Sequence, residues 1–429
     1  MFDKALQALI KFGTAADTFS DRLNSKYTSA LLVLFCVLVS TKQYVGEPIS
    51  CWCPANYAST HIDFANKVCW VTNTYYFSFN DTKLLTRKSK PLKYINYYQW
   101  VPLILIAQAI LFIVPRVFWK SLNTRKGISI MSLVDSIYEL QKPGAIDPVK
   151  RREVMNYAVK HFTRFLIDVD RKKQIAAIRN SFSVSARSCY LSILFITTKI
   201  MYFTNAFGQL FLLNLLFTMK TRYKVFGIQV WRELDEDIWT TAIYFPRVTM
   251  CDFKVRRLGS VHKETLQCAL TVNLFNEKVY IFIWFWFVIV STVSFLSLLK
   301  WIMLIAIERF SVRYVGDRLM AMKLIWNLDY DHSSNNVNIT EENFEQQLDN
   351  IPEETLVRNF VVNFLRRDGI LILRLLSEHA TDLIASEAIV SLFELYKQTR
   401  SLYRLSTEEQ STISRLRKYE KGSKKKLKV

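Results

Sequence analysis

The stretch from Tyr44 to Cys53, YVGEPISCWC, separates an apolar run from a cysteine-bearing loop. The apolar run spans 30–39, and the loop ends where a second apolar run begins, at 97–102. Cys51 and Cys53 stand one residue apart, just beyond a segment of membrane-spanning length. Disulfides persist in oxidising compartments, so this arrangement indicates a crosslinked loop held close to the outer face of a membrane.

Composition also indicates a membrane protein. Of 429 residues, 51% are hydrophobic and 14% are aromatic, and the charges crowd into some stretches and are absent from others. A charged group in hydrocarbon costs several kcal/mol unless it reaches water, which explains such a distribution. The net charge of +20 would also suit a nucleic-acid partner. No fingerprint of a DNA- or RNA-binding module is present, so we expect no nucleic-acid partner and assign the charge to cytoplasmic segments that flank spans.

Four apolar segments have the length of about 20 residues that crosses hydrocarbon. The first ends at Lys42 and Gln43, where Lys42 is expected to extend toward the interface. The second contains Pro115, which is expected to kink or end the span. The third includes Lys199, which is either a functional charge inside the membrane or the cytoplasmic edge of the span. The fourth has no charge over 279–299.

Cysteine placement orients these spans. Five of the seven cysteines fall in the two loops that share one side, and thiols pair outside the cytosol, so both termini are expected to be cytoplasmic. The fold class is therefore mainly α: a four-helix transmembrane subunit with disulfide-bonded extracellular loops and a helical cytoplasmic domain. The predicted segments are an amino-terminal helix and lead-in (1–26), four spans (27–45, 100–119, 189–219 and 279–307), two extracellular loops (46–99 and 220–278), a cytoplasmic loop (120–188), a cytoplasmic helical domain (308–405) and a disordered basic tail (406–429).

Amphipathic helical patterns occur outside the spans as well. The pattern over 1–26 indicates a helix that either lies on the membrane surface or folds back into a pore. A second pattern runs over 147–174 and begins at Asp147-Pro148, and two more follow over 351–367 and 368–397. The lysine-rich tail has no core to bury, and anionic membrane lipid is its expected partner.

Four of the five cysteines in the two outer loops are candidates for disulfides, two in each loop. Cys51 and Cys69 stand 18 residues apart in the first outer loop, and Cys251 and Cys268 stand 17 apart in the second. These spacings suit two loops clamped side by side, but all three pairings of four cysteines stay open. Cys51-Trp52-Cys53 would also suit a metal or redox motif, although disulfides are the expected use in an outward loop. Cys53 is left over, either free or bonded to another subunit.

No catalytic or cofactor-binding constellation is present. The five histidines are scattered without the spacing of metal ligands, and no glycine-rich phosphate loop occurs. We therefore predict no enzymatic activity, no cofactor and no metal site. Asn80-Asp81-Thr82 is an N-glycosylation acceptor on the outward side, whereas Asn338 would lie in the cytosol and stay unmodified.

Six separated motifs resemble those of the innexins, the invertebrate gap-junction family, over Met1 to about Lys397. The most specific is YYQWVP, the family's hallmark at the start of the second span, which pannexins lack although they share the topology. It comprises Tyr97, Tyr98, Gln99, Trp100, Val101 and Pro102. The others are YVGEPISCW at 44–52, CWVTNTY at 69–75, FPRVTMCDFKVR at 245–256, QCALTVNLFNEKVYIFIWFW at 267–286 and FLRRDGILILRLL at 364–376.

The resemblance implies a ring of subunits around an axial pore. Copies of this chain, alone or with other innexins, would form the ring, which docks to a ring in the neighbouring cell at gap junctions of the plasma membrane and passes ions and small molecules. It also implies the disulfides Cys51–Cys268 and Cys69–Cys251. The implied pore-lining residues are Met1, Phe2, Asp3 and Lys4 of the amino-terminal helix and Lys42, Gln43, Tyr44 and Glu47 at the end of the first span.

Two departures from the family pattern keep other functions open. Cys53 is additional to the usual two cysteines per loop, and a glycan on Asn80 would obstruct docking. The alternatives are an undocked hemichannel that releases small solutes and a non-conducting adhesion scaffold at cell contacts.

Overall fold

The chain folds as two compact units. The computed structural model describes residues 17–55, 57–72, 74–75, 94–95, 97–123, 153, 155–164, 166, 189–218, 245–257, 259–333, 353–379 and 382–398. The first unit takes its described residues from 19–118 and 198–298, and the second from 17–18, 119–197 and 299–398. The features predicted outside the described residues are Met1, Phe2, Asp3 and Lys4, the Asp147-Pro148 helix start, Asn80, Asn338 and the basic tail.

The first long helix begins at Phe19 rather than at the predicted Tyr27. It consists of α2 (Phe19–Arg22), a π-helical stretch η1 (Leu23–Thr28) and α3 (Ser29–Tyr44), and the whole run is long and apolar enough to cross a membrane. The hydropathy pattern missed its first turns because they are polar. Asn24 and Ser25 are buried, and their side chains donate to backbone oxygens one turn earlier. These local hydrogen bonds let polar residues lie inside an apolar bundle.

Two further helices of the described chain are long and apolar enough to span a membrane, α5 and α11. α5 (Val101–Asn123) follows a short 3-10 helix, η2 (Tyr97–Trp100), and continues through Pro115. Pro115 therefore does not end the helix, because the loss of one backbone donor can be compensated by packing against neighbours. α11 (Thr271–Ala306) begins eight residues before the predicted Val279, and its polar first turns, which include Asn273 and Glu277, are buried.

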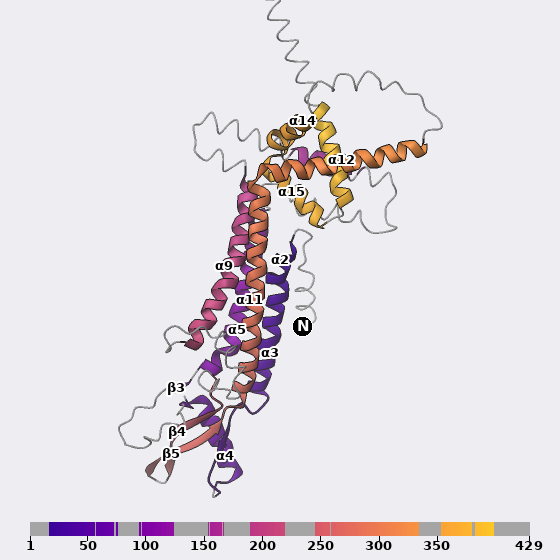
Figure 1. Cartoon of the computed structure of the whole chain (residues 1–429). Helices are drawn as coiled ribbons and strands as arrows, with labels where there is room; N and C mark the ends of the chain where they lie inside the picture. Colours follow the sequence, from indigo (N-terminus) through magenta and orange to yellow (C-terminus); the bar gives the residue numbers. More distant parts are fainter. Residues whose placement is uncertain are drawn as a thin grey trace, which may run out of the picture. The chain divides into compact units, whose positions relative to one another are not determined.

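The fourth long helix, α9 (Tyr190–Thr218), lies beside α3, α5 and α11 (Figure 1). It has 29 residues, long enough to span a membrane, although it is not among the three candidate spans found within the described residues. It nevertheless shares one apolar core with the others. That core joins Leu32 and Val39 of α3, Leu105 and Phe112 of α5, Ala206 and Leu213 of α9, and Ile283 and Phe287 of α11.

The loops at one end of these helices form a five-stranded antiparallel sheet that the sequence patterns did not reveal (Figure 1). Its strands, in spatial order, are β1 (Ser50–Trp52), β5 (Ser260–Ala269), β4 (Val248–Arg257), β2 (Thr74–Tyr75) and β3 (Tyr94–Ile95). β4 and β5 form a hairpin whose turn contains Gly259 at φ 89°, a conformation that glycine adopts without strain. A helix, α4 (Ser59–Val71), lies against β1 and β4.

The second unit is helical. Its elements are α12 (Glu308–Ser333), α14 (Glu353–Asn359), a π-helical stretch η5 (Phe360–Leu365), α15 (Arg366–His379) and a helix over 382–398. The helices predicted over 351–367 and 368–397 are thus divided differently, and Arg366 has the positive φ of 57°. Residues 155–164 of the predicted 147–174 helix are helical and bury Met155, Val159 and Phe162.

Candidate functional site

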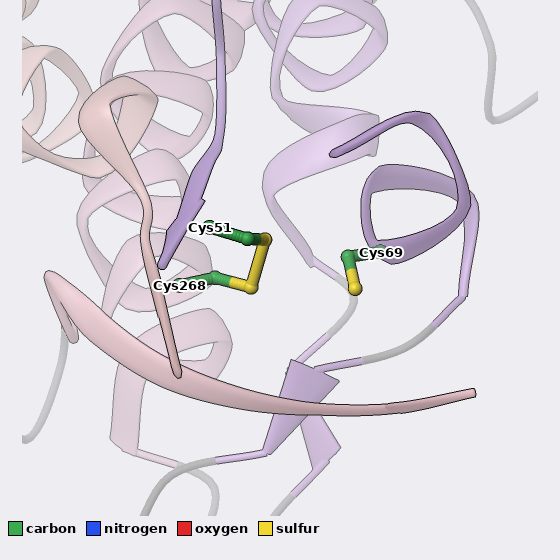
Figure 2. A group of neighbouring side chains, drawn as sticks. All are labelled: Cys51, Cys69 and Cys268. Atoms are coloured by element: carbon green, nitrogen blue, oxygen red, sulfur yellow. A yellow bond between two sulfur atoms is a disulfide. The ribbon is translucent and has the colours of Figure 1, made fainter. Parts of the chain in front are cut away.

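Two disulfides join the two loops that the sequence places between spans. Cys51 and Cys268 are directly opposite each other on β1 and β5, with their Cα atoms 3.9 Å apart, and Cys69 of α4 is bonded to Cys251 of β4. This is the pairing that the family resemblance implies. Figure 2 shows the Cys51–Cys268 bond with Cys69 beside it. We call the sheet β1–β5 together with α4 the disulfide cap.

The cysteine sulfurs cluster closely enough to resemble a metal site. The sulfur atoms of Cys51, Cys69 and Cys268 all lie within 4.8 Å of one another and are buried. Each of these sulfurs is already in a disulfide, and only a thiolate binds metal. Because Cys51 is already bonded to Cys268, the geometry of the sulfur cluster does not support a metal site at Cys51-Trp52-Cys53.

Cys53 takes part in neither bridge. Its side chain is half-buried and packs against the apolar cluster that surrounds the disulfides. Burial raises the pKa of the Cys53 thiol above its ordinary value. A protonated thiol is a weak nucleophile, so Cys53 can persist next to two disulfides without exchanging with them.

The YYQWVP motif connects the disulfide cap to the helices. Tyr98 is fully buried, and its ring centroid lies 4.9 Å from that of Trp70 on α4. The Gln99 amide donates to the Trp70 carbonyl over 2.6 Å. Val101 and Pro102 are buried at the start of α5, whereas Trp100 is exposed and Tyr97 packs against Phe245. The motif therefore holds one end of the cap against α5.

The carboxyl end of α3 carries the second group of predicted site residues. Gln43 is buried, and its amide donates to the Tyr98 carbonyl over 2.7 Å, so its burial does not support the predicted place on a pore surface. The sequence around Gln43 could not show that this side chain is buried, because its hydrogen-bond acceptor lies 55 residues away. Tyr44 and Glu47 are exposed, and the half-buried Lys42 ammonium lies 5.6 Å from the Phe275 ring centroid. Lys42, Tyr44 and Glu47 thus remain candidates.

Gly46 has a steric role in this turn. A Cβ added at Gly46 would lie 2.9 Å from the Lys42 carbonyl oxygen, closer than real Cβ atoms approach backbone. The glycine therefore lets the chain turn tightly from α3 toward β1, which leaves Tyr44 and Glu47 exposed.

Asp252 joins three strands of the disulfide cap. Its carboxylate accepts from the Tyr75 hydroxyl of β2 over 2.9 Å and from the Thr265 hydroxyl of β5 over 2.8 Å, and the Lys263 ammonium lies 3.0 Å away. Partial burial by itself would raise the pKa of Asp252. The hydrogen bonds from Lys263, Thr265 and Tyr75 together outweigh that effect and hold its pKa below the usual value.

The lowered pKa of Asp252 predicts a pH-dependent cap. The ionised carboxylate stabilises the fold above its unfolded pKa, and this contribution is lost as the pH falls through the lower folded value. We expect Asp252→Asn to increase hydrogen exchange of the β4–β5 amides at pH 6 and to match the wild type once the pH falls below the folded pKa of Asp252. If the difference in hydrogen exchange between Asp252→Asn and the wild type were the same at every pH measured, the charge of Asp252 would not be involved.

A buried ion pair connects the first helix to α9. Lys199 Nζ lies 2.8 and 2.9 Å from the two carboxylate oxygens of Asp21, and both side chains are less than a tenth exposed. Close by along η1, Asn24 donates to Ser294 and Trp286 donates to Thr28, both of which link the first helix to α11. Lys199 is therefore a buried charge that is paired within the helix bundle.

In the second unit, Asp368 of the FLRRDGILILRLL motif caps α9. Its buried carboxylate accepts from the backbone N–H groups of Leu191 and Ser192, over 3.2 and 2.9 Å, and from the Ser192 hydroxyl. A carboxylate at a helix N-terminus satisfies N–H groups that lack partners in the helix and complements the helix dipole.

We expect Asp368→Ala to destabilise the protein by about 1–2 kcal/mol, because the α9 cap is lost and buried donors lose their acceptor. Thermal unfolding of the purified protein in detergent measures this. Asp317→Ala removes an exposed acid of α12 whose ion pair to Arg313 is 3.9 Å long, so that variant serves as the control and should change little. Equal effects of the two variants would contradict the capping role.

The long apolar helices and the disulfide-bonded cap define a membrane protein of the multi-pass class with a crosslinked domain at one end of its helices. The innexin family model matches residues 17–396. The chain is 33% identical to innexin unc-9 of Caenorhabditis elegans over 387 residues, 89% of this chain and 92% of that relative. It is 31% identical to innexin-11 of C. elegans over 424 residues (95% and 87%) and 32% identical to innexin-19 of Caenorhabditis briggsae over 388 (89% and 87%).

The chain therefore belongs to the innexin family, the gap-junction channel subunits of invertebrates. Members of this family are channel proteins and not enzymes, and the apolar helices and the family together place the chain in the plasma membrane.

Proposed function

We propose that this gap-junction channel subunit crosses the plasma membrane four times, assembles into a ring around a pore, and docks through its disulfide cap to a ring in the adjacent cell. The observation that carries the proposal is the joining of both outer loops into one sheet by Cys51–Cys268 and Cys69–Cys251. Two loops that are covalently joined present one rigid surface, and rigidity reduces the entropy lost on docking.

The burial pattern of α9 supports its role as the third of the four spans. Its polar Gln209 is buried, and Lys199 is paired with Asp21, whereas Phe207, Phe211 and Leu215 are exposed. Polar groups that face the bundle and apolar groups that face outward are the arrangement expected of a helix surrounded by lipid or by neighbouring subunits.

The disulfides are the main support for the proposed orientation, and the charge of the cytoplasmic loop agrees with it. The disulfide cap belongs on the oxidising side, which leaves both termini and the basic loop over 120–188, with 14 Lys and Arg against 6 Asp and Glu, in the cytosol. Anionic lipid of the inner leaflet is the proposed partner of the basic tail.

The proposed pore combines the amino-terminal residues Met1, Phe2, Asp3 and Lys4 with the exposed outer residues Lys42, Tyr44 and Glu47. Rings of like side chains set ion selectivity through their charge and through the pore width. Because each subunit repeats Glu47, even one charge per chain becomes a ring of charge around the axis.

Paired cells test the proposed function. When both cells of a pair express this chain, a dual voltage clamp should measure junctional conductance, and single cells serve for hemichannel currents. Coupling between cells supports the docked channel, whereas dye uptake by single cells without coupling would favour the hemichannel, with a glycan on Asn80 as the physical reason. Surface expression with neither current would leave the adhesion scaffold.

Glu47→Lys should change selectivity more than conductance. Replacing a ring of carboxylates with a ring of ammonium groups disfavours cations electrostatically, so we expect the cation-to-anion permeability ratio to fall several-fold, with Glu47→Gln in between. Reversal potentials under a salt gradient measure this ratio. Lys67→Glu changes an exposed charge on α4 and serves as the control. An unchanged ratio in Glu47→Lys would exclude Glu47 from the pore.

A further inference from the structure

The end of the β4–β5 hairpin presents an unbalanced basic face. Residues two apart on a strand share a face, so Asp252, Lys254 and Arg256 point to one side of β4, while the buried Phe253 belongs to the apolar core on the other. Lys263 of β5 lies directly opposite Lys254. This face, which we call the basic face, therefore carries the three cations Lys254, Arg256 and Lys263 and one acid.

Only one of those cations has an acidic partner in the described chain. Lys263 lies 3.0 Å from Asp252, whereas Lys254 and Arg256 are exposed and have no carboxylate within 4.0 Å among the described residues. Like charges that face each other directly across two strands destabilise a sheet. An anion that lies across Lys254 and Lys263 would remove this repulsion, so the arrangement favours an acidic partner.

The chain itself contains a matching acidic segment. The run ELDED at 233–237 contributes Glu233, Asp235, Glu236 and Asp237, which are four of the seven acidic residues in the loop over 220–278. This run lies outside the described residues. No other five-residue stretch of either outer loop holds as many carboxylates.

We propose that the basic face of one subunit binds the acidic run 233–237 of a facing copy in the docked ring. The inference rests on the proposed docking of two rings. The hairpin belongs to the sheet that lies beyond the ends of α3 and α11 (Figure 1), where a facing ring would approach. Docked rings of identical subunits are related by two-fold axes, so each contact is made twice, with basic face on acidic run in both directions. Complementary charge of this kind selects the partner and accelerates encounter.

Charge reversal in paired cells tests the proposal. Variant H is Lys254→Glu with Arg256→Glu, and variant A is Asp235→Lys with Glu236→Lys. We write H|A for a cell pair in which one cell expresses variant H and the other expresses variant A. Like charges meet in the H|H and A|A pairs, so we expect junctional conductance to fall by more than about tenfold in each. In the H|A pair every contact again joins opposite charges, and conductance should return to within about twofold of the wild type. Arg313→Glu reverses an exposed charge on α12, outside the disulfide cap, so it is the control and should couple normally.

Each other outcome overturns the inference in a distinct way. Rescue only when H and A are combined on one chain, and not in H|A, would place the contact within a ring. Loss in H|H with normal coupling in A|A would identify a different polyanion as the partner, and normal coupling in H|H would exclude the basic face. Surface labelling of each variant separates lost docking from lost delivery. The absence of coupling in wild-type pairs would instead overturn the proposed function.

Discussion

Replacing Cys51 with serine is expected to abolish junctional coupling. The Cys51–Cys268 bond ties β1, an edge strand, to β5 and so links the first outer loop to the second across a sequence separation of 217 residues. Removing a native disulfide from a small, loop-rich domain costs about 2–5 kcal/mol. The disulfide cap has few strands and a small apolar core, so a loss of that size should prevent it from folding into one docking surface.

The single variant should be worse than the variant that lacks both cysteines. Cys51→Ser leaves the Cys268 thiol next to Cys69, because the sulfurs of Cys51, Cys69 and Cys268 lie within 4.8 Å of one another. A thiolate that close to a disulfide attacks it and rearranges the bonds. The double variant Cys51→Ser with Cys268→Ser has no such thiol and should retain the Cys69–Cys251 bond and part of its surface delivery.

Surface biotinylation, non-reducing gels and paired-cell conductance together measure this difference. Cys53→Ser removes a cysteine of the same cluster that is in neither bridge, and it should fold and couple normally. Loss of coupling in Cys53→Ser would instead point to a bond between subunits. Normal coupling by Cys51→Ser would show that the sheet holds the loops together without the bridge.

Breaking the Asp21–Lys199 pair should have the second large effect. Asp21→Asn leaves the Lys199 ammonium buried without its counter-ion, and Lys199→Met leaves the Asp21 carboxylate in the same position. Removing one partner of a buried ion pair costs about 3–5 kcal/mol, because the remaining charge has lost its compensation. Both residues lie in long helices of the bundle, where both side chains are buried.

The double variant Asp21→Asn with Lys199→Met distinguishes this mechanism from general damage to the helices. It removes both charges, so its stability should be much closer to that of the wild type than either single variant is. Thermal unfolding in detergent measures the stability of each variant, and junctional conductance measures its function. Arg22→Gln, which changes the exposed neighbour of Asp21, is the control. If the double variant loses as much stability as the sum of the two single variants, the two charges do not compensate each other.

The family and its broad features were predictable from local sequence. Apolar runs identified α3, α5 and α11 as spans because mean hydropathy depends only on neighbouring residues. The helices begin at Phe19 and Thr271, before the spans predicted from Tyr27 and Val279, because buried polar turns lower a hydropathy profile without ending a helix. The β4–β5 hairpin and α4 were not predicted, although the alternation of Phe253 and Val255 with charged residues was a signal that could have revealed β4.

The amino-acid sequence by itself determined the membrane class and the innexin motifs, since each is encoded in runs of contiguous residues, and the resemblance to the family implied which four cysteines form the bridges. Tertiary structure decided how they are used. Cys51 is bonded to Cys268 because β1 and β5 place them in register, Gln43 is buried because the Tyr98 carbonyl accepts its amide, and Lys199 is paired because Asp21, 178 residues away, lies beside it. Such pairings depend on packing between distant segments, which no local pattern of residue types encodes.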